Sequence, residues 1–159
     1  MKEFNRKDLS TEILTNKAFD EARQIHRKSS TAQGRSLEEI FKVSVYGLAA
    51  EQFLIERCNF ADNPDAYQDV ISPEGIKVEV KVTKVGHYVP HVLGRLKDKR
   101  RKYPNLYQPD WVFIYINDMK STEYKMAGTY MWNDNRYLVK DWYEELDREF
   151  LANYEGAKD

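Results

Sequence analysis

Residues 69–82 read DVISPEGIKVEVKV, and this stretch predicts a β-hairpin that carries charged side chains on one face. Both ends of it read as strands. Pro73 suits the first corner of a type I turn, and Gly75 suits the left-handed residue that closes a three-residue loop. A loop of this length sets the register of the two strands, and it places Asp69 opposite Glu79.

The charged face of this hairpin predicts a metal site with a lysine beside it. Directly opposed residues have Cβ atoms roughly 5 Å apart, and like charges there are destabilising, so Asp69 and Glu79 call for a cation. Lys81 shares their face at period two, while Val78 and Val80 point the other way into a core. The alternative is an ordinary half-buried strand whose charged residues meet water.

A third carboxylate, Glu51, lies on a helix predicted from residue 36 to about residue 57. Ser36 and Glu39 match a capping box at its start. Glu51 falls about 60° from the centre of the apolar stripe of this helix, and Gly47 leaves room one turn earlier. An acid near a core usually has a partner, because an unpaired buried charge is costly. The alternative is a glutamate that reaches water at the edge of the stripe. The stripe consists of Leu37, Phe41, Ser44, Leu48 and Ile55.

A helix with a glutamate, followed by Asp and then Glu-x-Lys on a hairpin, resembles the PD-(D/E)XK nuclease superfamily. The resemblance covers roughly residues 36–84 and extends in outline to residue 117. It implies an α/β fold with a restriction-endonuclease-like core, in which helices flank a central mixed β-sheet and a catalytic hairpin, with an extra N-terminal helix. The chain departs from the motif at Gln68, where the family name has proline.

The resemblance also implies a role for each residue of the motif. Asp69 and Glu79 would be ligands of Mg²⁺ or Mn²⁺, with the carbonyl of Val80 as a further ligand. Glu51 would complete the metal shell, and Lys81 would be the catalytic lysine. Hard oxygen ligands suit these metals, which can activate a water molecule and clamp a phosphate. Lys81 would orient the attacking water or stabilise the developing negative charge.

The expected function is therefore that of a Mg²⁺- or Mn²⁺-dependent endonuclease acting on DNA. A Holliday-junction resolvase or an exonuclease of the same superfamily remains open, because the core motif is shared by all three. A nuclease-fold protein that binds nucleic acid without cutting it also remains open. The chain has no P-loop, no glycine-rich dinucleotide motif and no HExxH motif, so other enzyme classes find no support.

The formal net charge is only −1, but the charges are unevenly distributed along the chain. From Lys81 to Lys102 there are eight basic residues and one acid, a local charge of +7, whereas residues 141–159 carry −5. Because the basic stretch directly follows the hairpin, it predicts a DNA-binding surface, although the solvated face of a helix is the alternative. The predicted nucleic-acid-binding residues are Lys84, Arg95, Lys97, Lys99, Arg100, Arg101 and Lys102, flanked by Tyr88, Tyr103 and Tyr107, which could stack on bases.

The 159 residues predict a single nuclease-like domain. Its parts are an N-terminal helical extension (1–35, with a helix from 10 to about 28), the core motif region (36–117), and a C-terminal strand and helix (118–159). Further predicted elements are a basic helix at 92–103, a buried strand at 111–116, a strand at 124–132 and an acidic helix from 140 to about 154.

Composition favours a soluble, cytoplasmic protein with no membrane partner. No apolar run reaches membrane-spanning length, and the N-terminus lacks the apolar segment of a signal peptide. A single cysteine excludes an internal disulfide, as is usual for the cytosol. Whether two copies form a homodimer is left open.

Overall fold

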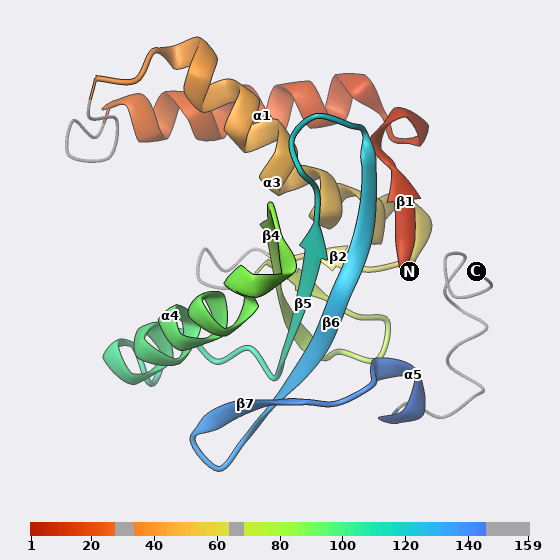
Figure 1. Cartoon of the computed structure of the whole chain (residues 1–159), viewed down its shortest axis with the longest axis vertical. Helices are drawn as coiled ribbons and strands as arrows, with labels where there is room; N and C mark the ends of the chain where they lie inside the picture. The colour runs from red at the N-terminus through yellow and green to blue at the C-terminus, as the bar shows by residue number, and fades with distance from the viewer. Residues whose placement is uncertain (28–33, 64–68, 146–159) are drawn as a thin grey trace.

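The computed structural model describes residues 1–27, 34–63 and 69–145, which form a mixed β-sheet with helices packed against it (Figure 1). The strand order is β1-β6-β5-β4-β3-β2, with β7 also paired to β6. Strands β4 and β5 run parallel and the other pairs are antiparallel, which confirms the predicted α/β class with a mixed sheet. The strands are β1 (Glu3–Asn5), β2 (Ala61–Asp62), β3 (Val70–Ile71), β4 (Lys77–Thr83), β5 (Trp111–Ile116), β6 (Glu123–Asn133) and β7 (Arg136–Val139).

Helices cover both faces of this sheet. In Figure 1, α1 and α3 pack against each other above the sheet, and α4 lies beside its lower half. No helix in the described part of the chain is long and apolar enough to cross a membrane. The helices are α1 (Thr11–Arg27), α3 (Leu37–Arg57), α4 (Val89–Lys102) and α5 (Trp142–Glu145), with short 3-10 turns at η1 (Arg6–Asp8) and η2 (Gly86–Tyr88).

The predicted hairpin forms in the predicted register. Ile71 is opposite Lys77 in the β3–β4 pair. The Ser72 N–H donates to the Ile76 carbonyl at 2.9 Å, and Gly75 has a φ of 87°, the left-handed conformation that glycine adopts without strain. The turn therefore determines the alignment of the two strands from local sequence alone.

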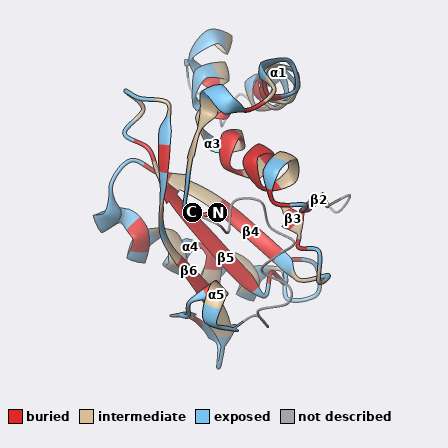
Figure 2. Cartoon of the chain, turned by 90° about the vertical axis from the view of Figure 1, so that its right-hand side faces the viewer, coloured by how far each residue is buried: buried red, intermediate tan, exposed pale blue. Residues whose placement is uncertain are grey.

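Helix α3 begins as predicted but buries a different face. The Ser36 hydroxyl accepts a hydrogen bond from the Glu39 N–H at 3.1 Å, which confirms the N-cap. Leu48 and Ile55 of the predicted stripe are only partly buried against the main core. A single stripe was the wrong description, because both halves of α3 contact α1 or the residue before it, and the second half also packs on the sheet (Figure 2). The buried residues of the second half are Ala49, Ala50, Gln52, Phe53 and Leu54.

The sheet separates two apolar clusters, and the charged residues of β4 lie on the α4 side. Val78 and Val80 belong to the cluster under α3. Glu79 and Lys81 are in register with Val112 and Ile114 of β5, which belong to the cluster under α4. In-register residues of paired strands project to the same face. The alternation of β4 therefore turns its two valines toward α3 and its acid and lysine toward α4.

The remaining predicted elements agree with the structure except at their ends. Helix α4 begins at Val89, three residues before the predicted start, because Pro90 occupies its first turn, where no backbone N–H is needed. The strands β5 and β6 and helix α1 match their predicted positions to within one residue. Gln68 and most of the predicted C-terminal helix lie outside the described residues.

Strands β1, β2 and β7 were not predicted. The N-terminal residues belong to the sheet, since β1 pairs with β6 and the Met1 carbonyl accepts a hydrogen bond from the buried Tyr115 hydroxyl at 2.7 Å. Strands β1 and β7 pair with the longer β6, whereas β2 pairs with β3, which is as short as β2 itself; the sequences of such short strands carry little strand signal.

Candidate functional site

The centre of the candidate site is the pair formed by Glu79 and Lys81 on β4. The Lys81 Nζ lies 3.3 Å from the Glu79 Oε1. Only 3% of the Glu79 side chain is exposed, whereas 44% of the Lys81 side chain is exposed. The lysine therefore links a buried carboxylate to the molecular surface.

Asp69 joins this pair from the other strand of the hairpin. Its Oδ2 accepts a hydrogen bond from the Val80 backbone N–H at 2.8 Å. Burial raises the pKa of Asp69, although the hydrogen bond from Val80 and the charge of Lys81 act in the opposite direction. Asp69 thus lies beside Glu79 and Lys81, as the hairpin register predicted.

Glu51 approaches from α3 and lines a cavity of about 260 Å³ with Asp69 and Lys81. Burial, followed by the charges of Asp69 and Glu79, raises the pKa of Glu51 to about 9. Gly47 lines the same cavity, and nothing outside its own helix and chain neighbours lies within 4 Å of the position that a Cβ would take there. The helix acid therefore belongs to the same group as the hairpin acids, and Gly47 keeps the space beside it open.

The electrostatics of the site leave it short of positive charge. Burial, with a further contribution from Asp69, raises the pKa of Glu79 to about 7, against the opposing effect of Lys81. Burial by itself disfavours the ammonium of Lys81, but the carboxylates of Glu79 and Asp69 outweigh it and raise the pKa of Lys81. The charges of Lys81 and of Lys99 on α4 lower the pKa of Asp69 and Glu79 but do not outweigh burial, so the three carboxyl groups still disfavour one another's ionisation.

Asp69 and Glu79 offer oxygen donors of the kind that Mg²⁺ and Mn²⁺ prefer. The Glu79 Oε2 and the Tyr107 hydroxyl are both buried without a hydrogen-bond partner that meets the distance and angle limits among the described residues. Within residues 1–27, 34–63 and 69–145, no group of three or more His, Cys, Asp and Glu side chains is arranged to hold a metal by itself. Because Mg²⁺ typically takes only one or two carboxylates and completes its shell with water and substrate phosphates, Asp69 and Glu79 stay predicted ligands. The Val80 carbonyl stays a predicted ligand.

The basic block of the sequence divides into residues that face the site and residues that do not. Arg95 and Lys99 line a second cavity, of about 440 Å³, together with Lys81. Arg100 instead donates a hydrogen bond to the Pro109 carbonyl at 2.5 Å and lies over the Trp132 ring, 4.3 Å from its centroid. The remaining members line neither cavity: Lys84, Arg101 and Lys102 are exposed, and Lys97 is half-buried.

Tyr107 is a site residue whose role sequence reasoning missed. It is fully buried, so it cannot stack on bases, whereas Tyr88 is 48% exposed. The Lys99 Nζ lies over the Tyr107 ring, 4.3 Å from its centroid. Burial and the charge of Glu79 raise the pKa of the Tyr107 hydroxyl, which therefore stays protonated. Its distance from the hairpin in the sequence left no local signal of this position.

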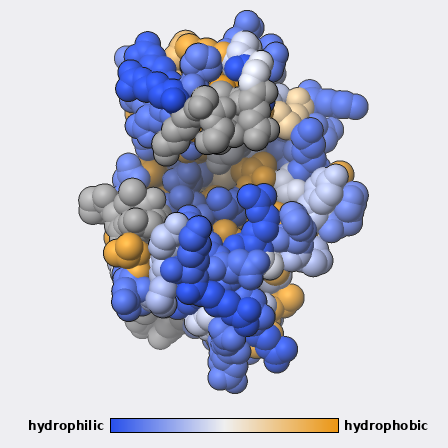
Figure 3. All heavy atoms as spheres, turned by 90° about the vertical axis from the view of Figure 1, so that its left-hand side faces the viewer, coloured by the Kyte–Doolittle hydropathy of each residue, from blue (hydrophilic) through white to orange (hydrophobic). Residues whose placement is uncertain are grey.

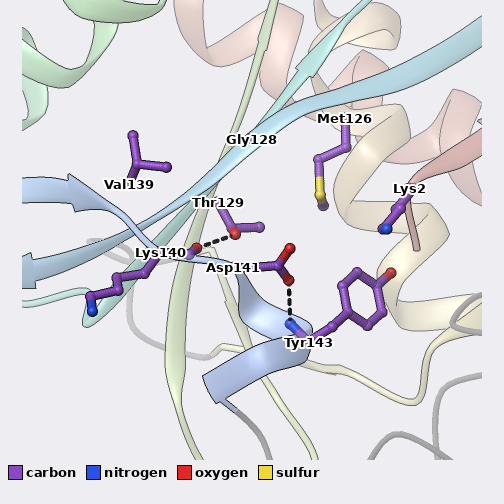
Figure 4. A pocket seen from close by; sticks show the side chains of 8 residues that line it. All are labelled: Lys2, Met126, Gly128, Thr129, Val139, Lys140, Asp141 and Tyr143. Atoms are coloured by element: carbon purple, nitrogen blue, oxygen red, sulfur yellow. Dashed lines mark hydrogen bonds between the residues drawn. The ribbon is translucent and has the colours of Figure 1, made fainter.

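A different hollow lies over β6, β7 and α5, and its polar groups serve the local structure (Figure 4). The Thr129 hydroxyl donates to the Lys140 carbonyl at 2.5 Å and accepts from the Trp142 N–H at 3.1 Å. The Asp141 carboxylate accepts from the Tyr143 N–H at 2.9 Å at the start of α5. These groups hold the end of β7 to the helix, and they do not form a second reactive centre.

The face that lies on the left-hand side of Figure 1 is largely hydrophilic and is hollowed at mid-height (Figure 3). Glu51, Asp69, Glu79 and Lys81, which lie on three different elements, are brought together by the fold. No protein-family model, no curated protein and no solved structure matches this chain.

Proposed function

We propose that this chain is a metal-dependent endonuclease that hydrolyses phosphodiester bonds of DNA, with a restriction-endonuclease-like core of the PD-(D/E)XK type. The observation that carries the proposal is the convergence of Asp69, Glu51 and the Glu79–Lys81 pair around strand β4. The hairpin and helix α3 supply these groups, which supports the resemblance to the motif. We propose the cytoplasm as its location, since its single cysteine is free and buried.

A purely structural ion pair explains this group poorly. One buried acid beside one lysine would be sufficient for an ion pair, yet Glu51 and Asp69 add negative charge that disfavours the folded state. Raised pKa values at three neighbouring carboxyl groups are typical of functional sites. The excess of acids is explained if the site binds a divalent cation, which would supply Lewis acidity toward a phosphate and an activated water.

Each side chain then has a definite task. Asp69 and Glu79 hold the cation, and Glu51 adds negative charge from α3. Lys81 keeps its proton at neutral pH, because its pKa is raised. It therefore acts as a fixed positive charge and hydrogen-bond donor toward the attacking water or a phosphoryl oxygen, and not as a general base.

A second candidate function is binding of nucleic acid without cleavage. It is favoured by the lack, in the described part of the chain, of a ready-made metal site of three or more ligands. The basic residues would serve both functions equally well. Only a cleavage assay distinguishes the nuclease from the binding protein. The DNA forms that are cut also distinguish an endonuclease from an exonuclease or a junction resolvase.

The test is incubation of the protein with supercoiled, linear and branched DNA in the presence of Mg²⁺, Mn²⁺ or EDTA. We expect nicking or linearisation of supercoiled DNA with either metal and none with EDTA. Glu79→Gln, which removes the charge but keeps the shape, should abolish cleavage. Glu123→Gln, the same change at an exposed strand residue, is the matched control and should leave the rate unaltered. Metal-independent binding without cleavage of any DNA form would support the second candidate.

A further inference from the structure

Two cavities of opposite electrostatic character meet at Lys81 and Val82, which line both. The cavity of about 260 Å³ is lined by three acids, Glu21, Glu51 and Asp69, against two bases, Arg35 and Lys81, so we call it the acidic cavity. The cavity of about 440 Å³ is the basic cavity. Its lining residues are Lys81, Val82, Val92, Arg95, Leu96 and Lys99. Lys81 therefore lies between the acidic cavity, which suits a cation, and the basic cavity, which suits an anion.

The basic cavity is built by one face of α4. Arg95 and Lys99 are four residues apart, which places them on the same side of the helix. Leu96, between them, is 4% exposed and anchors this part of α4 on the sheet. The valines Val82 and Val92 make the floor apolar, so the charged groups are the only polar side chains that line the cavity.

Among the described residues, no ion pair accounts for Arg95 or Lys99. Within the described residues, neither the Arg95 nor the Lys99 side chain lies within 4.0 Å of a carboxylate oxygen. Lys81 is paired with Glu79, and the carboxylates of Glu79 and Asp69 act on Lys99 only from beyond ion-pair distance, so Arg95 and Lys99 leave positive charge in the cavity that an anion can join. Lys99 is nevertheless held in place, because its ammonium lies over the Tyr107 ring.

We propose that Arg95 and Lys99, together with Lys81, form a phosphate subsite that takes a phosphodiester group of the nucleic-acid backbone next to the reacting bond. The placement beside the reacting bond rests on the proposed nuclease function, whereas the binding of a backbone phosphate does not. Arg and Lys together supply a planar donor fork and a point charge, which suit the non-bridging oxygens of a phosphodiester. Tyr107 is the positioning residue, since its ring fixes the Lys99 ammonium.

The proposal distinguishes Lys99 from Lys102, one turn later on α4. The two lysines carry the same charge, and each lies over a tyrosine ring, with Lys102 at 5.5 Å from the Tyr103 centroid. Only Lys99 lines the basic cavity. Lys102→Met is therefore a matched control for Lys99→Met, and both changes keep the aliphatic stem.

The experiment measures binding of a short fluorescein-labelled oligothymidylate by anisotropy in EDTA, so that cleavage plays no part. We expect Lys99→Met to weaken binding by about tenfold or more and Lys102→Met by no more than about threefold. Inorganic phosphate should displace the oligonucleotide from the wild type more effectively than from Lys99→Met. Arg95→Met, a change at an exposed residue, is the second variant and should behave like Lys99→Met.

Equal losses for Lys99→Met and Lys102→Met would overturn the subsite, because they would show that α4 supplies only a general positive field. Absence of binding by the wild type at low salt would overturn it as well. The proposed nuclease function fails separately, when the wild type binds DNA but cuts none of the three forms with either metal. In that case the loss of binding in Lys99→Met would still establish the phosphate subsite.

Discussion

The carboxylate of Asp69 accepts a hydrogen bond from the backbone N–H of Val80 at 2.8 Å, across the hairpin. A residue proposed to bind a metal therefore also ties the two strands together one step beyond their last backbone pair, Val70 and Val78. The Asp69 carboxylate therefore has two roles, to hold the hairpin strands together and to bind the proposed metal. Substitutions at this position have to be chosen so that they affect one role and not the other.

Asp69→Asn and Asp69→Ala separate the two roles. The amide oxygen of asparagine can still accept from Val80, so Asp69→Asn should keep the melting temperature of the metal-free protein. Asp69→Ala should lower the stability by about 1 kcal/mol, because the buried N–H loses its partner. Both variants should lose metal-dependent cleavage. Thermal unfolding in EDTA, compared with the cleavage assay, checks this; equal melting temperatures for the two variants would contradict the structural role.

Addition of Mg²⁺ or Mn²⁺ should raise the melting temperature of the wild type, because the metal binds only the folded state. At a metal concentration one hundred times the dissociation constant, the free energy of unfolding should increase by about 3 kcal/mol. Glu79→Ala should show no such shift. Lys81→Met should keep the shift but lose turnover, because the lysine acts on the reacting groups and not on the metal. Differential scanning fluorimetry with and without metal measures this. A wild type with neither a shift nor cleavage would refute the catalytic proposal.

The stability of the metal-free protein should fall as the pH rises from about 5 to about 9. The pKa of Glu51 is raised from an ordinary value of 4.5 to about 9, so between these values the folded protein holds a proton that the unfolded chain releases. Stability from this group is greatest at low pH and is lost as Glu51 is forced to ionise in the folded state. Glu79, with a pKa of about 7, acts in the same direction over the lower part of this range.

Glu51→Gln should therefore flatten the dependence of stability on pH. Urea denaturation in EDTA at about pH 5, 7 and 9 gives the slopes. Glu38→Gln is the control, because Glu38 is an exposed acid on the same helix, with 79% of its side chain accessible. If Glu51→Gln and Glu38→Gln show the same slope as the wild type, Glu51 is not buried among the site acids in solution.

Arg100→Ala should lower the melting temperature, whereas Arg101→Ala should not. Arg100 donates to the Pro109 carbonyl and stacks on Trp132, while Arg101 is exposed. Loss of the hydrogen bond and the ring contact should cost about 1–3 kcal/mol. In a triple alanine variant of Lys99, Arg100 and Arg101, a loss of DNA binding could not be distinguished from a loss of stability. Single variants measured by thermal unfolding and by salt-dependent anisotropy separate them, and an unchanged melting temperature in Arg100→Ala would contradict this role.

Local sequence was sufficient for the features whose cause is local. The hairpin register follows from Pro73 and Gly75, because a short turn permits only one alignment of its strands. The start of α3 follows from Ser36, because a side chain next to the first turn satisfies its free N–H groups. The period of two along β4 places Glu79 and Lys81 on one face. These three facts were enough to predict the central group of charged residues.

Only the tertiary structure decided the features that depend on how helices and strands pack against one another. Helix α3 has two partners, α1 and the sheet, and a single hydrophobic stripe cannot represent two directions of packing. Arg100 and Lys99 are adjacent in a uniform basic run, yet Arg100 turns to Trp132 and Lys99 to the Tyr107 ring beside the site. Contacts between residues distant in the chain form only when the elements dock, so no local pattern of the sequence encodes them.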